Sequence, residues 1–128
     1  MFSHIMVGSN DIARSRRFYD AVLGVLGAGA PLQNQNQTGQ TRLFYRHDGN
    51  TFAVSEPLDG AAASFANGGT IGFTCTSPEQ VLKFHEVAVA NGGRSIEDPP
   101  GPRARNGMHL AYVRDPDGNK LVAVFRPN

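Results

Sequence analysis

The sequence predicts an α+β fold of two tandem strand-helix-strand-strand-strand modules. The first observation is an internal repeat, because Ser3–Gly8 and Thr70–Cys75 each have the pattern of a strand that leads into a helix. Phe18 and Phe84 take matching places in the two helical patterns, 66 positions apart. One such module cannot bury its small sheet alone, so the two copies are expected to pack together.

The second observation is an Asp-Gly-Asn turn in each half, at Asp48–Asn50 and at Asp117–Asn119. Each turn lies between two strand-like runs, which is the pattern of a hairpin. At 128 residues the chain has the length of one domain. We expect module 1 over about residues 1–58, a linker over about 59–67 and module 2 over about 68–128. A cleft between paired curved sheets is a natural site for a small ligand.

The composition narrows the function classes. Hydrophobic residues make up 40% and charged residues 18%, as in a soluble globular protein. The 12 basic and 11 acidic residues create no field that would attract nucleic acid. No apolar run approaches the roughly 20 residues that cross a bilayer, and no signal peptide is visible, so no membrane partner is expected. Cys75 is the single cysteine, which excludes an internal disulfide and fits a cytoplasmic location.

The first half begins with a short strand over about 2–7. Ser9–Asp11 then offers side-chain oxygens that can cap a helix N-terminus. Apolar residues recur at helical spacing from Ile12 to Leu23, and Gly24 is expected as the C-cap. The segment 33–39 is expected to form a polar loop or a ragged edge hairpin. Two hairpin strands follow, over 41–46 and 51–55, and then a linker of small residues over 57–68.

The second half repeats this plan. Ser77 and Pro78 are suited to the N-cap and first position of a helix, which is expected to close at Asn91–Gly93. The proline-rich segment 99–102 predicts a loop. The expected strands cover 69–76, 94–97, 108–114 and 120–125.

Two segments resemble a known family. Arg17–Gly24 is similar to the Phe-Tyr-x-x-x-Leu-Gly motif that closes the first helix of the glyoxalase/bleomycin resistance protein/dioxygenase family, within the vicinal oxygen chelate superfamily. Asp115–Leu121 resembles the turn near the C-terminus of that family. The resemblance covers essentially the whole chain and implies two βαβββ modules around a U-shaped cavity. It says little about chemistry, because one fold hosts many functions.

The resemblance also implies where a metal would bind. Metal-dependent members, which include isomerases and ring-cleaving dioxygenases, take up to four ligands from the first and last strands of each module, whereas drug-sequestering members hold no metal. The offset of 66 places His4 opposite Thr70, where metal-binding relatives commonly have His. Threonine is a poor ligand for a divalent transition metal. The Glu ligand that usually follows the second turn is replaced by Val122, which cannot coordinate.

The fourth position is ambiguous. An offset of 66 pairs Val122 with Glu56, whereas matching the two Asp-Gly-Asn turns gives an offset of 69 and pairs Val122 with Ala53. We favour the second pairing, because the turns lie closer to the position in question, and then expect Glu56 to be a solvated carboxylate. No metal cofactor is therefore favoured. A divalent metal ion held by His4 and Glu56 is the alternative.

His4 is the candidate catalytic residue, as a hydrogen-bonding group or general base at the cavity floor. The alternative is an inherited histidine without a chemical task. Five further residues are candidates for ligand contact, namely Arg42, Phe44, Arg103, His109 and Tyr112.

Each of these five has an alternative role. Arg42 and Phe44 alternate with Leu43 and Tyr45, and we favour an arginine face turned outward with Leu43 and Tyr45 in the core. The loop 99–105, with Arg103, either covers the cavity mouth or is a plain exposed loop. His109 and Tyr112 lie on opposite faces of one strand, so one of them is expected to point into the cavity. We expect the solvent to surround the basic run Arg14–Arg17 on the first helix, and also His47 in the first hairpin turn.

The function expected from these residues is binding of a small apolar, aromatic or anionic molecule in the cavity between the modules, without a catalytic metal. The alternative is a metal-dependent enzyme that resembles lactoylglutathione lyases or extradiol dioxygenases. A homodimer is expected, because short modules leave sheet edges and helix faces that a two-fold partner can cover.

Overall fold

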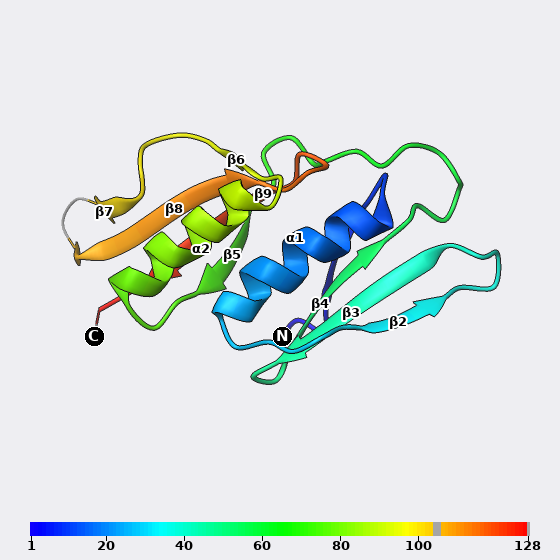
Figure 1. Cartoon of the computed structure of the whole chain (residues 1–128), viewed down its shortest axis with the longest axis horizontal. Helices are drawn as coiled ribbons and strands as arrows, with labels where there is room; N and C mark the ends of the chain where they lie inside the picture. Colours follow the sequence, from blue (N-terminus) through cyan, green and yellow to red (C-terminus); the bar gives the residue numbers. More distant parts are fainter. Residues whose placement is uncertain (104–105, 128) are drawn as a thin grey trace.

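The computed structural model describes residues 1–103 and 106–127 and has two modules, each with one helix and a mixed sheet (Figure 1). Module 1 comprises β1 (Ile5–Gly8), α1 (Ile12–Val25), β2 (Leu32–Gln35), β3 (Thr41–His47) and β4 (Asn50–Ser55). Module 2 comprises β5 (Ile71–Thr74), α2 (Pro78–Ala90), β6 (Arg94–Ser95), β7 (Gly101–Arg103), β8 (Met108–Arg114) and β9 (Lys120–Phe125). The predicted α+β fold is confirmed.

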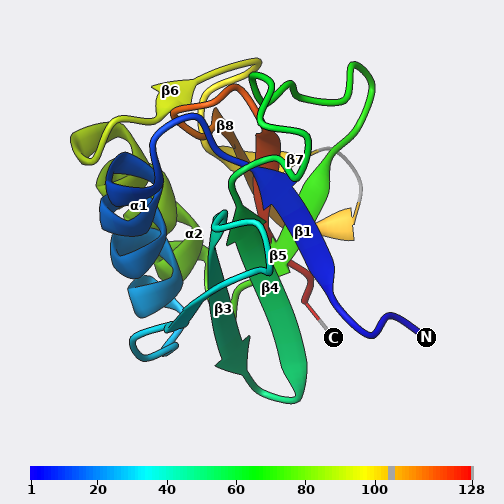
Figure 2. The same ribbon diagram turned by 90° about the vertical axis from the view of Figure 1, so that its right-hand side faces the viewer.

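The two sheets have corresponding strand orders, β1-β4-β3-β2 and β5-β9-β8-β6, with β7 added to β8. In each sheet the first strand of the module runs parallel to the last. Both helices lie on the same side of the sheets and pack against each other (Figure 2). We call the opposite side of each sheet the helix-free face. β1 and β5 are outer strands that do not pair with each other.

Capping residues set the starts of the helices. The Asp11 side chain accepts a hydrogen bond from the Arg14 N–H at 3.1 Å, and Ser77 Oγ accepts one from the Gln80 N–H at 3.1 Å. Pro78 occupies the first turn of α2, as predicted. Within the described ranges, neither helix combines the length and apolar character needed to cross a bilayer.

Two predicted boundaries were wrong. Gly24 does not end α1, which continues to Val25, because the left-handed conformation that stops the chain falls at Gly27 (φ 103°). The proline-rich segment contains β7, which pairs with β8. Pro102 is tolerated there because β7 is an outer strand, where a missing N–H is not needed. Ala104 and Arg105 of the predicted loop lie outside the described residues.

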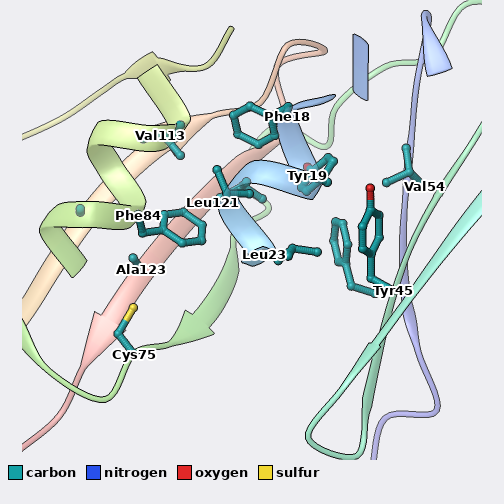
Figure 3. Close-up of a cluster of buried hydrophobic side chains, with 14 of the residues drawn as sticks. Phe18, Tyr19, Leu23, Tyr45, Val54, Cys75, Phe84, Val113, Leu121 and Ala123 are labelled. Atoms are coloured by element: carbon teal, nitrogen blue, oxygen red, sulfur yellow. The ribbon is translucent and has the colours of Figure 1, made fainter. Parts of the chain in front are cut away.

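The hydrophobic core is continuous across both modules (Figure 3). A chain of aromatic rings crosses the boundary between the modules. The distances between ring centres are 4.8 Å for Tyr19 and Phe52, 5.4 Å for Phe52 and Phe73, and 5.8 Å for Phe73 and Phe84. Cys75 is buried in this core, and burial raises the pKa of its thiol to about 11. Because the two modules share one core, the space between them has a fixed shape.

Candidate functional site

A pocket of about 320 Å³ lies between the two modules. Its apolar wall comes from Leu23 of α1 and from strand residues that face the helices, namely Ile5, Phe52, Ile71 and Phe73. Other lining residues, such as Thr51, Gly72 and Thr74, belong to the helix-free face. The pocket therefore lies between the unpaired edges of β1 and β5, and residues from both faces of the sheets line it.

Polar groups from the β3–β4 hairpin and from the start of α2 both line the pocket. His47 and Asp48 contribute from the hairpin. Gln80 contributes from α2, where its Oε1 accepts from the Thr76 N–H at 2.7 Å and its Nε2 donates to the Val25 carbonyl at 3.0 Å. These bonds tie the start of α2 to the end of α1 and hold this part of the pocket in place.

His4 is exposed at the start of β1 and lines the pocket. Its Nδ1 lies 2.9 Å from the Ser3 Oγ, so one ring nitrogen has a hydrogen-bond partner within the chain. Among the described residues, the other ring nitrogen has no hydrogen-bond partner. A role for His4 in proton transfer stays a prediction.

Strand register decides the ambiguous fourth position. Ile5 pairs with Phe52 in module 1, and Ile71, 66 positions after Ile5, pairs with Leu121 in module 2. Phe52 and Leu121 are therefore equivalent and 69 positions apart, so Val122 corresponds to Ala53. The alignment by the two turns is confirmed, and both equivalent positions carry side chains without a donor atom.

Glu56 lies elsewhere. It is half-buried rather than solvated, because its Oε1 accepts from the Thr41 N–H at 2.7 Å. It lines a second pocket of about 380 Å³ beside the β2–β3 turn, away from the pocket that His4 borders. Glu56 is not solvated as expected, because its carboxylate accepts a hydrogen bond from a backbone N–H at the end of the β3–β4 pair.

The residues at the four family positions do not fit a metal site. Of His4, Thr70, Ala53 and Val122, only His4 has a side chain that commonly binds a divalent metal, and one imidazole does not hold an ion. In the part of the chain that the structure describes, no group of three or more His, Cys, Asp or Glu side chains could hold one.

The alternation of β3 has the expected sense. Leu43 and Tyr45 are buried against the helices, and Arg42 and Phe44 lie on the helix-free face. The Arg42 Nε donates to Asn34 Oδ1 at 2.9 Å, and its guanidinium lies 5.6 Å from the Phe44 ring centre. Neither side chain borders the pocket between the modules. Their contact with a ligand stays a prediction.

The candidates in module 2 are dispersed. His109 faces the helix side, 6.1 Å from the Phe125 ring, whereas Tyr112 lies on the helix-free face with the Lys120 Nζ 4.8 Å from its ring centre. The prediction that they occupy opposite faces is confirmed. The Arg103 guanidinium donates to backbone carbonyls of its own loop, including Pro99 at 3.0 Å. Arg103 thus organises the loop, and its role toward a ligand stays a prediction.

Sequence reasoning missed part of the pocket. His47, expected to be simply solvated, lines the pocket mouth, because the hairpin folds against the loop after α1. A Cβ placed on Gly27 would lie 3.2 Å from His47 Cε1, which shows how close this approach is. Phe52 and Phe73 were also missed. The available signal was that Phe52 lies in β4, which pairs with the outer strand β1, and that Phe73 lies in the outer strand β5.

Comparisons with known proteins agree with this geometry. The sequence profile of the Glyoxalase/Bleomycin resistance protein/Dioxygenase superfamily matches residues 1–123. A glyoxalase/bleomycin resistance protein from Albidiferax ferrireducens is 49% identical, with a TM-score of 0.87 and 99% of each chain covered. A glyoxalase-related enzyme from Fulvimarina pelagi is 22% identical, with a TM-score of 0.76 over 99% of this chain and 89% of that one, and shows the same fold.

One curated relative matches the chain at lower identity. A lactoylglutathione lyase of Arabidopsis thaliana is 26% identical over 125 residues, or 98% of this chain. The chain spans 44% of the length of that relative. With a superfamily match over residues 1–123 and a 49% identical structure along its whole length, this chain belongs to the Glyoxalase/Bleomycin resistance protein/Dioxygenase superfamily.

Proposed function

We propose that this chain binds a small apolar or aromatic molecule in the pocket between its modules, without a catalytic metal. The observation that carries the proposal is the strand register, which makes Ala53 and Val122 equivalent at two of the four positions where metal-dependent relatives place ligands. The pocket between the modules has an apolar wall that includes Ile5, Phe52 and Phe73. Binding of an apolar molecule is what such a cavity does best.

The lining favours aromatic over anionic ligands. The Phe52 and Phe73 rings meet edge to face, with their centres 5.4 Å apart, and a planar ligand can add a further offset or edge contact. Asp48 places a carboxylate at the pocket mouth, which disfavours an anion. The Arg42 and Arg103 side chains, which would suit an anion, are occupied by Asn34 and by loop carbonyls.

The alternative function is a metal-dependent lyase or dioxygenase. The likeness to lactoylglutathione lyases supports the superfamily and the fold at 22–26% identity; the two plant proteins are more than twice as long as this chain, whereas the match covers 87% of a probable lactoylglutathione lyase of Vibrio cholerae. A metal-dependent reaction would need ligands that the four family positions do not supply.

Metal analysis of protein purified without a histidine tag separates the two functions. We expect less than stoichiometric Zn, Ni, Fe or Mn, before and after incubation with each ion and desalting. One bound ion per chain that is lost in His4→Ala would overturn the metal-free proposal.

A thermal-shift titration then tests ligand binding. We expect 2-naphthol to raise the melting temperature in a saturable manner, because a ligand that binds only the folded state stabilises it by mass action. Inorganic phosphate serves as the anionic probe and is expected to give no saturable shift beyond that of matched ionic strength. A saturable shift with phosphate alone would replace the aromatic ligand class by an anionic one.

A further inference from the structure

Gly72 is a glycine in the middle of a strand, where glycine normally weakens the structure. It lies in β5, is exposed and lines the pocket between Ile71 and Phe73. Glycine in a strand loses more backbone entropy on folding than other residues and has no side chain to pack. Its presence at this position therefore calls for a physical reason.

The other strand glycines have such reasons. At Gly8, in β1, an added Cβ would lie 2.9 Å from the Ala63 Cβ, so the linker packs too closely for a side chain. Gly101, in β7, has a φ of 153°, a conformation that other residues rarely adopt. Close packing explains the first glycine and backbone conformation explains the second.

Neither reason applies to Gly72. Its φ is not positive, and an added Cβ would meet Val122 Cγ1 at 3.5 Å and Val124 Cγ2 at 3.8 Å, which are ordinary contact distances. Among the described residues, both the backbone and the packing thus leave room for a side chain. The equivalent position in module 1, 66 residues earlier, carries Met6, whose side chain is 43% exposed.

We propose that Gly72 sets the size of the molecule that the pocket accepts, by keeping free the space beside Val122 and Val124 at the edge of β5. This inference rests on the proposed binding function and narrows its ligand class to planar aromatic molecules. The Phe52 and Phe73 rings form one wall of the same pocket, and the bare backbone at Gly72 lets a flat ligand approach the strand closely. Any larger residue at position 72 would take part of the approximately 320 Å³.

Two substitutions with two probes test the proposal. Fluorescence titration measures the Kd of 2-naphthol, and thermal shift measures binding of phenol, for the wild-type protein, Gly72→Ala and Gly72→Leu. We expect Gly72→Leu to weaken 2-naphthol binding by roughly ten-fold or more, because extra carbon atoms in a filled site cause overpacking. The single-ring probe should lose less than about three-fold, since it needs less of the space.

Gly24 supplies the matched control. It lies exposed in α1, outside the pocket lining, and an added Cβ there meets no described atom within 4 Å. Gly24→Leu should leave both affinities unchanged. Gly72→Ala should raise the melting temperature of the free protein by about 3 °C, because it restricts the unfolded chain without straining the strand.

Each contrary outcome is distinct. Equal loss of both probes in Gly72→Leu, or equal 2-naphthol affinity in Gly72→Leu and wild type, overturns the size-setting role while leaving the binding function intact. Destabilisation by Gly72→Ala would show that the fold itself needs the glycine and also overturns the role. A change of mass in sedimentation for Gly72→Leu but not Gly24→Leu would assign the glycine to contact with a second copy. Absence of binding of either probe to the wild-type protein overturns the proposed function, and this inference with it.

Discussion

The two Asp-Gly-Asn turns have the same sequence but different roles. The turn of module 1 is an exposed hairpin, in which Asp48 (φ 53°) and Gly49 (φ 78°) both take the left-handed conformation of a tight two-residue turn. Asp48 borders the pocket mouth. The turn of module 2 is largely buried, with Asp115 4% and Asn119 8% exposed.

The buried turn holds the two modules together. The Asp117 side chain is 2% exposed, and its carboxylate accepts from the Arg14 guanidinium at 2.9 Å, from Ser15 Oγ at 3.1 Å and from the Asn10 N–H at 2.9 Å. All three donors belong to the start of α1 or the residues just before it, in the other module. The expectation that the basic run from Arg14 is only a solvated face was therefore wrong at Arg14, which pairs with a buried charge.

A second carboxylate in the same turn extends this contact. Asp115 Oδ2 accepts from the Tyr19 hydroxyl at 2.5 Å, and Asp115 also accepts from the Asn119 backbone and side chain. The same three residues therefore form different turns, because Asp48 and Gly49 close a two-residue loop between His47 and Asn50, whereas the second loop runs from Arg114 to Lys120 and Asp117 has no positive φ. The role of each turn depends on what the surrounding chain packs against it.

The sharpest test of this difference is a matched pair of isosteric substitutions. Asp117→Asn should lower the free energy of unfolding by about 2 kcal/mol, because the nearly buried carboxylate accepts three hydrogen bonds from the other module, while water still reaches the Arg14 side chain, which is 38% exposed. Asp48→Asn should change it by less than about 0.5 kcal/mol, since an exposed turn loses little and Asn also tolerates a positive φ. Urea denaturation measures both values. Similar losses in the two variants would show that the buried turn is not a clamp between the modules.

A glycine pair probes the same contrast with a smaller effect. Gly118 (φ 93°) and Gly49 (φ 78°) both need the left-handed conformation, so alanine should cost about 1 kcal/mol at either position. At Gly118 the added Cβ would also lie 2.7 Å from Phe65 Cδ1, whereas at Gly49 no described atom lies within 4 Å. We expect Gly118→Ala to lose about 1 kcal/mol more than Gly49→Ala.

Removing the obstructing ring checks the cause of that excess. In the Phe65→Ala background the additional loss from Gly118→Ala should disappear, which a double-mutant cycle measures. If Gly118→Ala still loses more stability than Gly49→Ala in that background, the additional loss comes from the backbone of the turn and not from Phe65.

The third prediction concerns pH. Burial and then the neighbouring Asp115 raise the pKa of Tyr19 well above its ordinary value of 10.0. A tyrosine that ionises less readily when folded stabilises the protein fully below pH 10, and this stability is lost as the pH rises above 10. The free energy of unfolding should fall by up to about 1.4 kcal/mol per pH unit for this group.

Two other groups contribute to the same alkaline loss. Burial and the Asp20 contact raise the pKa of Tyr45, and burial raises that of Cys75 to about 11 from 9.0. Tyr19→Phe and Tyr45→Phe should therefore each make the decline above pH 10 shallower, as followed by urea denaturation between pH 8 and 11. A decline as steep in Tyr19→Phe as in wild type would contradict the contribution of the Tyr19 hydroxyl beside the second turn.

The sequence was sufficient for features that repeat locally. Apolar periodicity, Ser77 and Pro78 at a helix start, and the two turns predicted both helices and the main hairpins, because each depends on residues a few positions apart. It was insufficient for β7, since a proline-rich segment becomes a strand only when β8 offers it an edge. The end of α1 was predicted wrongly because several glycines in this segment could end the helix.

For the site, the sequence by itself determined which ligand-forming side chains are present: no fold can give a donor atom to Ala53 or Val122. The tertiary structure alone decided where the others lie. It brought His4, His47, Gly72 and the Phe52–Phe73 pair to one gap and turned Glu56 toward a backbone amide. Residue chemistry is intrinsic to the chain, whereas proximity between distant residues depends on how two separately patterned modules share a single core.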